Sequence, residues 1–171
     1  MDDEGRHLPP GSLGEIVVRG DLVMAGYYRN IEASAEAARF GWHHTGDLGY
    51  RDEDGYYYLV DRKRDMIISG GFNIFPAEIE RRLLAHPAVM DCAVVGIPDP
   101  MWGEAVKAVV ECAPGAQVEA DTLIQFVREE LGSLKAPKSV EFWTSLPRSS
   151  VGKVLRREVR ARFWASADRQ I

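Results

Sequence analysis

The sequence predicts an α+β protein made of two unequal parts. Segments rich in Val, Ile and Tyr recur between Gly, Pro and Asp turns, as expected for short strands. Segments whose apolar residues stand three or four positions apart lie between those strands and predict helices. This order favours a small domain with a β-hairpin and a mixed sheet flanked by helices, preceded by a β-rich segment.

The charge distribution indicates where the two parts join. Residues 1–61 contain 12 acidic and 5 basic side chains, whereas residues 62–171 contain 14 acidic and 16 basic ones. The change falls at residues 60–65, where a strand-like apolar run meets a cluster of charges. We therefore expect one unit over residues 1–61, a junction at 62–65 and a second unit over 66–171.

Composition excludes several classes of protein. The chain is 46% hydrophobic and 27% charged, which is typical of globular domains and argues against disorder. Its longest apolar run, residues 56–60, is far shorter than the ~20 residues that span a bilayer. The acidic, polar first residues do not look like a secretory signal, so we expect a cytoplasmic protein without a membrane span. Cys92 and Cys112 stand in apolar segments and predict buried free thiols.

The first unit should consist mainly of short strands. Residues 14–20 predict a strand that ends at Gly20, and Asn30 is a suitable cap for a helix over residues 31–39. Two apolar runs on either side of a charged turn ending at Gly55 predict a hairpin within residues 48–61. So few apolar residues make a weak core. We therefore expect the apolar faces of these strands to pack against another part of a protein.

The second unit should alternate between strands and helices. A short strand at residues 66–68 precedes a helix that Pro76 opens and that presents Ile79, Leu83 and Leu84 on one face. Strands at residues 91–97 and 104–112 flank a turn at 98–103. A helix from about Asp121 to Gly132, a strand within 135–143 and a last helix from about Leu155 complete the order.

Three segments contain candidates for chemistry. Gly152 and Lys153 stand in an exposed turn that lacks the first Gly and the Ser or Thr of a phosphate-binding loop, so the lysine is either functional or simply solvated. Asp47 could accept hydrogen bonds from both hydroxyls of a ribose, or it could cap its own turn. The neighbouring His43 and His44 point in different directions on a strand and have no second ligand cluster, so we expect no metal site.

Gly70 and Gly71 interrupt an apolar segment at residues 68–76. Glycine allows a positive φ or the close approach of a ligand to the backbone, and either would explain this pair. The segment lacks the GxGxxG pattern, so a dinucleotide fold is not indicated.

Four segments in this order resemble the adenylate-forming (AMP-binding) enzymes, which include acyl-CoA synthetases, aryl-CoA ligases and firefly luciferase. They are GEIVVRGDLVMAGYY at 14–28, the long run at 41–80, GIPDPMWGE at 96–104 and KAPKSVEFWTSLPRSSVGKVLRR at 135–157. The resemblance implies that residues 1–61 match the β-rich end of the family's large N-terminal domain. It implies that residues 66–171 match the small C-terminal domain, while the rest of the large domain has no counterpart among these residues.

The resemblance also implies a reaction and roles for particular residues. The family joins a carboxylic acid to ATP, which is supplied with Mg²⁺, and passes the acyl group from AMP to coenzyme A. Lys153 matches the lysine that stabilises the first step, because a carboxylate must approach an α-phosphate there. Asp47 matches the aspartate that holds the ribose, and Arg62 matches an arginine beside the ribose and phosphates.

The remaining matches concern movement and the thiol substrate. Arg64 stands at the family's hinge, where Asp or Lys is usual, so residues 62–65 are expected to permit domain rotation. Gly70 and Gly71 resemble the loop that lines the tunnel for the pantetheine arm. Trp102 resembles an aromatic residue near the entering thiol, although packing over the sheet is an alternative.

Two functional hypotheses follow. The first is the C-terminal part of an AMP-forming acyl-CoA synthetase that is inactive alone and needs the large N-terminal domain. The second is a truncated, non-catalytic interaction module that retains the fold. Apolar surface left bare could promote self-association. No nucleic-acid role is expected, and the basic helix that follows Lys153 is interpreted as a solvated face.

Overall fold

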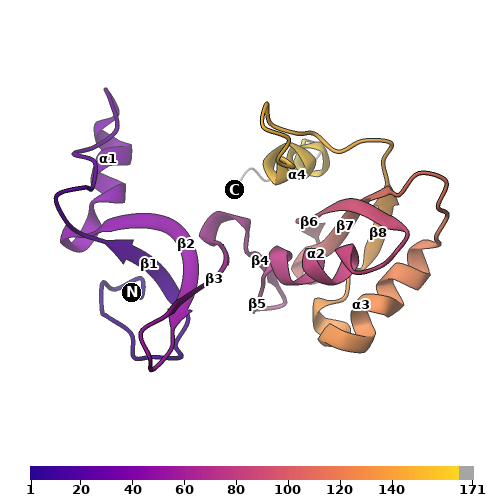
Figure 1. Cartoon of the computed structure of the whole chain (residues 1–171), viewed down its shortest axis with the longest axis horizontal. Coiled ribbons are helices and arrows are strands. Elements are labelled where there is room, and N and C mark those ends of the chain that lie inside the picture. The colour runs from indigo at the N-terminus through magenta and orange to yellow at the C-terminus, as the bar shows by residue number, and fades with distance from the viewer. Residues whose placement is uncertain (166–171) are drawn as a thin grey trace. The chain divides into compact units, whose positions relative to one another are not determined.

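The computed structural model describes residues 1–165, which divide into two compact units (Figure 1). The first unit is Met1–Arg64, and the second begins at Asp65. None of the described helices is long and apolar enough to cross a membrane.

The first unit is a three-stranded antiparallel sheet with a short helix (Figure 1). Its strands are β1 (Gly14–Val18), β2 (His43–Arg51) and β3 (Tyr57–Arg62), in that order across the sheet. Helix α1 (Ile31–Ala37) begins as expected, because the Asn30 side chain accepts a hydrogen bond from the backbone N–H of Ala33. A 3₁₀ turn, η1 (Arg39–Gly41), leads into β2. The predicted strand, capped helix and hairpin of this unit are confirmed.

The second unit contains a five-stranded mixed sheet. Its main path is β5 (Phe72–Ile74), β4 (Ile67–Ser69), β7 (Gly103–Cys112) and β6 (Val89–Asp99), and all these pairs are antiparallel. Strand β8 (Ser139–Phe142) pairs with β7 in parallel. The 3₁₀ turn η2 (Lys63–Asp65) spans the boundary between the two units. The pairing of β6 with β7 is the longest in the sheet and sets the register of its centre.

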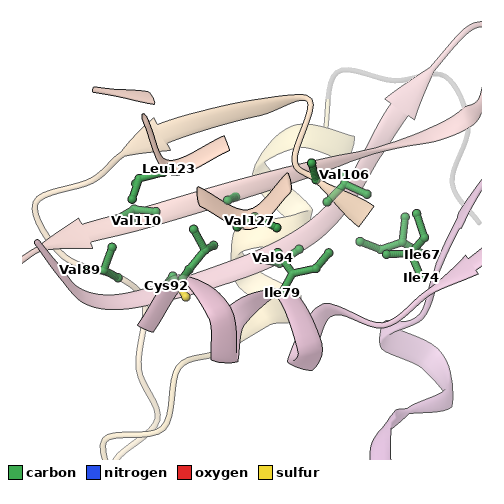
Figure 2. Close-up of a cluster of buried hydrophobic side chains, with 13 residues drawn as sticks. Ile67, Ile74, Ile79, Val89, Cys92, Val94, Val106, Val110, Leu123 and Val127 are labelled. Carbon is green, nitrogen blue, oxygen red and sulfur yellow. The ribbon is translucent and has the colours of Figure 1, made fainter. Parts of the chain in front are cut away.

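Helices cover both faces of this sheet, so successive residues of β6 and β7 are buried on opposite sides. One cluster joins α2 (Pro76–Leu84) and α3 (Ala120–Lys135) to Cys92, Val94, Val106 and Val110 (Figure 2). The other joins α4 (Arg156–Trp164) to the intervening positions; its buried members are Ala93, Val95, Val109, Leu146 and Val159. Strands buried on both faces explain the near-continuous Val and Ala runs of the sequence.

One strand was missed by the sequence prediction, and one helix extends beyond its predicted end. Strand β5 was not predicted, because its three residues directly follow the glycine pair and carry no alternation long enough to detect. Helix α3 continues to Lys135, but Gly132 adopts φ +80°, so the regular helix ends there as predicted and a further turn follows.

The two thiols are free, as predicted, but they differ in burial. Cys92 is buried, whereas Cys112 is only partly so. Burial, together with the nearby carboxylates of Glu80 and Asp91, raises the pKa of the Cys92 thiol well above its ordinary value. Cys92 is therefore a packing residue and not a nucleophile.

The first unit lacks a core of comparable size. Both buried clusters consist of residues from Ile67 onward. The first unit instead exposes many large apolar side chains: Leu13, Val18, Leu22, Met24, Tyr27, Tyr28, Ile31, Phe40, Tyr50, Tyr56, Tyr57, Tyr58 and Leu59. Its sheet is therefore held mainly by backbone pairing and polar contacts.

Removing core volume should destabilise the second unit specifically. Ile79 is 0% exposed between α2 and β6, so Ile79→Ala should lower the free energy of unfolding by about 2–5 kcal/mol. The matched control is Ile31→Ala at an 86% exposed position, which should cost less than about 0.5 kcal/mol. Urea unfolding followed by circular dichroism measures both, and equal losses would contradict this assignment of the core.

Candidate functional site

Asp47 and Arg62 face each other on adjacent strands. They are register partners in the β2–β3 pair, and the Arg62 Nε lies 2.6 Å from the Asp47 Oδ1. Both side chains are partly exposed. A carboxylate can accept further hydrogen bonds beside this one, so the pair presents an acceptor and a planar cation at the same place. These are the groups that a ribose and a phosphate require.

The segment before Asp47 is fixed by side chains. The Asp47 N–H donates to the Thr45 Oγ1 at 3.1 Å, and that hydroxyl donates to the carbonyl oxygen of Ile16 at 2.7 Å. Gly46 adopts φ +73°, a conformation that favours glycine, and its N–H donates to the Glu15 Oε1 at 3.0 Å. The Thr45–Gly46–Asp47 segment is thus a local bend held by hydrogen bonds.

Glu15 is a buried carboxylate that the sequence prediction missed. Its Oε2 lies 3.0 Å from the Nδ1 of His44 and 3.2 Å from the Nζ of Lys63, and its side chain is 7% exposed. Burial alone would raise its pKa, but hydrogen bonds from His44, Lys63 and Gly46 outweigh that effect and hold the pKa below its ordinary value. The sequence did contain a signal for this buried carboxylate, because Glu15 stands within an otherwise apolar strand segment.

The two histidines form no ligand cluster. His44 Nε2 lies 3.2 Å from the Arg39 carbonyl oxygen, so both of its ring nitrogens face protein acceptors. Within residues 1–165 no group of three or more His, Cys, Asp or Glu side chains could hold a metal ion. His44 therefore has a structural position in this unit.

Lys153 lies near the tip of an exposed loop between β8 and α4. Arg148 and Val154 form an isolated antiparallel bridge that closes the loop, and Ser149 makes two hydrogen bonds with the backbone of Lys153. Gly152 adopts φ +83°, which permits the tight turn. In the described part of the chain the Lys153 ammonium group has no ion pair or hydrogen bond. The loop thus presents a cation that has no partner among the described residues.

Arginines on both sides fasten this loop to the rest of the second unit. Arg148 lies 2.6 Å from the Asp91 Oδ2 and 3.1 Å from the Glu111 Oε2. Arg156, the first residue of α4, binds both carboxylate oxygens of Glu80 and lies 3.2 Å from the Asp65 Oδ2. These contacts hold the base of the loop while its tip remains exposed.

The interpretation of the basic helix as a solvated face is wrong for part of α4. Arg156 makes the contacts just described, and Arg160 lies 2.8 Å from the Oε1 of Glu104, which is buried. Arg162 lies over the Trp143 ring, 4.3 Å from its centroid. The partners are far away in sequence, so the charge pattern alone could not reveal them.

Gly70 and Gly71 form the two-residue turn of the β4–β5 hairpin. Both have positive φ, +58° and +83°, which is characteristic of a tight hairpin turn. A Cβ on Gly70 would lie 2.5 Å from Cε3 of Trp102, whereas a Cβ on Gly71 would meet nothing within 4 Å. Trp102 packs on the turn and is still 48% exposed. The structure therefore brings these three residues together.

Arg64 lies at the boundary between the units. Lys63, just before it, pairs with Asp3 and Glu15 of the first unit, and Asp65, just after it, pairs with Arg156 of the second. The expected rotation at residues 62–65 stays a prediction. Asp47 and Arg62 belong to the first unit, whereas Lys153, Gly70, Gly71 and Trp102 belong to the second.

Comparison with known proteins identifies a family with which this chain shares sequence. Residues 78–153 match the family described as AMP-binding enzyme C-terminal domain. The resemblance found in the motifs is thereby confirmed, because this part of the chain matches the model of that family. The match ends at Lys153, the predicted catalytic lysine.

Particular relatives extend the similarity over nearly the whole chain. A feruloyl-CoA synthase from Amycolatopsis is 53% identical over 93% of this chain, and a fatty acid–[acyl-carrier-protein] ligase from Streptomyces coeruleorubidus is 46% identical over all of it. ATP-bound MatB from Rhodopseudomonas palustris has a TM-score of 0.89 at 37% identity and 98% coverage. The chain spans 32% and 33% of the two curated relatives and 33% of MatB.

The buried Glu15 carboxylate should make the stability of the first unit depend on pH. Because its folded pKa lies below the ordinary 4.5, its contribution is present above pH 4.5 and is lost as the pH falls through the lowered pKa. Glu15→Gln cannot titrate. The thermal midpoint of the parent chain should therefore fall more steeply between about pH 5 and pH 3 than that of the variant. Parallel curves would contradict this role.

Proposed function

We propose that this chain is the C-terminal part of an ATP-dependent, AMP-forming acid–thiol ligase of the acyl-CoA or aryl-CoA type. The observation that carries the proposal is the 44–53% identity to acyl-CoA and aryl-CoA ligases over more than nine-tenths of the chain. The exposed ammonium of Lys153, which has no partner among residues 1–165, supports it. We include a cytoplasmic location in this proposal, since the thiols are free.

The first half-reaction joins the acid to AMP. A carboxylate oxygen attacks the α-phosphorus of ATP, and the bond from that phosphorus to the bridging oxygen breaks, so pyrophosphate leaves. Negative charge concentrates where the carboxylate meets the phosphate. Lys153 would place its positive charge there, while Asp47 would hold the ribose hydroxyls and Arg62 the phosphate side. Mg²⁺ would arrive with ATP as part of the substrate.

The second half-reaction transfers the acyl group. The thiol of coenzyme A gives up its proton to solvent and its sulfur attacks the acyl carbonyl carbon, and AMP leaves with the electrons of the broken carbon–oxygen bond. Rotation at Arg64 would exchange the Lys153 loop for the Gly70–Gly71 turn. Open space at Gly71 and the half-exposed Trp102 suit a narrow thiol arm.

The relatives differ in the molecule that accepts the acyl group. They include CoA ligases, an acyl-carrier-protein ligase and, in McbA from Marinactinospora thermotolerans, an amide bond synthetase. McbA has a TM-score of 0.85 at 44% identity. We propose coenzyme A because the CoA ligases include the relative of 53% identity.

Adenylation should require both an N-terminal portion and Lys153. The chain can be joined to the N-terminal two-thirds of the Amycolatopsis feruloyl-CoA synthase, and pyrophosphate exchange measured with a panel of acids. We expect activity in the fusion and none in the 171-residue chain alone. Lys153→Ala should reduce the fusion's rate by roughly 10²- to 10³-fold, since it removes one key electrostatic group.

The exposed Lys138→Ala is the matched control and should retain adenylation. Turnover by the isolated chain would overturn the predicted inactivity. A fusion that forms no adenylate with any acid, although its N-terminal part is active in its parent enzyme, would favour the non-catalytic module.

Substitution at the glycine turn should affect the other half-reaction. Gly71→Leu would fill the open space and strain a position with φ +83°, so thioester formation from a supplied acyl-adenylate should fall at least about tenfold. Adenylation by the same variant should stay near the parent rate. Lys153→Ala should show the reverse pattern, and equal damage to both steps by either variant would argue against two conformations.

A further inference from the structure

Glu15 is a buried charge in the first unit to which the proposed reaction assigns no task. It lies on β1, whereas the residues of the proposed nucleotide site lie on β2 and β3. Its side chain is 7% exposed, yet the carboxylate is charged under ordinary conditions because its partners hold the pKa low. Burying a carboxylate costs free energy unless its oxygens accept hydrogen bonds or pair with cations. The partners of Glu15 therefore indicate its role.

Both carboxylate oxygens of Glu15 contact the segment that precedes Asp47. Oε1 accepts the N–H of Gly46 at 3.0 Å, and Oε2 lies 3.0 Å from the ring of His44. These contacts involve the residues one and three positions before Asp47. The backbone bend at Gly46 is therefore fixed relative to β1.

Glu15 also contacts Lys63, the residue that follows Arg62. Lys63 Nζ lies 3.2 Å from the Glu15 Oε2 and 2.6 Å from the Asp3 Oδ1. Burial lowers the pKa of Lys63, but the hydrogen bonds to Asp3 and Glu15 outweigh that effect and raise it, so the ammonium stays charged. Glu15 therefore binds residues on both sides of the Asp47–Arg62 pair.

We propose that Glu15 is a positioning residue of the nucleotide site, which ties the bend before Asp47 to Lys63 after Arg62 and so fixes the ribose-binding pair. This inference rests on the proposed function, since it assumes that Asp47 and Arg62 bind ATP. Glutamine would keep the shape of Glu15 but present its amide group to Lys63 and His44. A neutral side chain cannot replace this tie.

The kinetic test uses the fusion enzyme with Glu15→Gln and, separately, Lys63→Met. We expect KM for ATP to rise roughly ten- to a hundredfold in Glu15→Gln, as displaced binding groups do, while KM for the acid and for coenzyme A stays within about twofold. Lys63→Met removes the other end of the tie at a half-buried position and leaves the carboxylate in place. It should shift KM for ATP in the same direction, independently of how Glu15→Gln folds.

Two controls separate positioning from general stability. Glu78→Gln breaks an ion pair with Lys135 on the second unit and should leave every KM unchanged. If Glu15 acts through Asp47, then Glu15→Gln should add little to Asp47→Asn, and the double variant should be strongly non-additive. Additive effects, or an equal rise in KM for all three substrates, would overturn the proposal.

Hydrogen exchange on the 171-residue chain tests the tie without catalysis. Glu15→Gln should speed exchange of the amides at residues 44–47 and 61–64 by about tenfold, and leave those of β6 and β7 unchanged. Unchanged exchange in the first two segments would overturn the inference. A fusion without adenylation would instead count against the proposed function, while exchange would still decide the role of Glu15.

Discussion

The antiparallel pairing of β6 with β7 is the constraint on which the second unit depends. The two strands stay in register from Asp91–Glu111 to Asp99–Gly103, and their side chains enter two separate cores. Helices α2 and α3 belong to one core and α4 to the other, so the positions of all three follow from the pleat of this one pair. Val159 of α4 is buried against that sheet, and this packing fixes the position of the Lys153 loop, which directly precedes α4.

Buried glutamates provide a second level of order, and each supports a loop rather than the core. Glu111 accepts from the backbone of Leu146 and from Arg148 beside the Lys153 loop. Glu104 accepts from the backbone of Ile68 near the glycine turn and from Arg160. Glu15 has the same part in the first unit. In all three cases, one carboxylate joins a backbone N–H to a cation, which fixes a functional segment at a cost in desolvation.

Much of the fold could be predicted from the sequence because periodicity and capping act locally. Pro76, Asn30 and the apolar face containing Ile79 and Leu83 each specify a helix within a few residues. The three residues of β5 could not be predicted, because they form a strand only through pairing with β4. The motif residues Asp47, Lys153 and Gly71 were visible in the sequence. Their supports were not, since Glu80 and Arg156 are 76 positions apart and meet only in the folded chain.

The contact between Asp65 and Arg156 joins the start of the second unit to its last described helix. Asp65 is the first residue of the unit, and Arg156 opens α4. The same guanidinium binds Glu80 of α2, so one side chain connects three segments that are far apart in the sequence. A displacement of Asp65 is therefore transmitted to α4 directly, through charged groups, and not only through the β6–β7 framework.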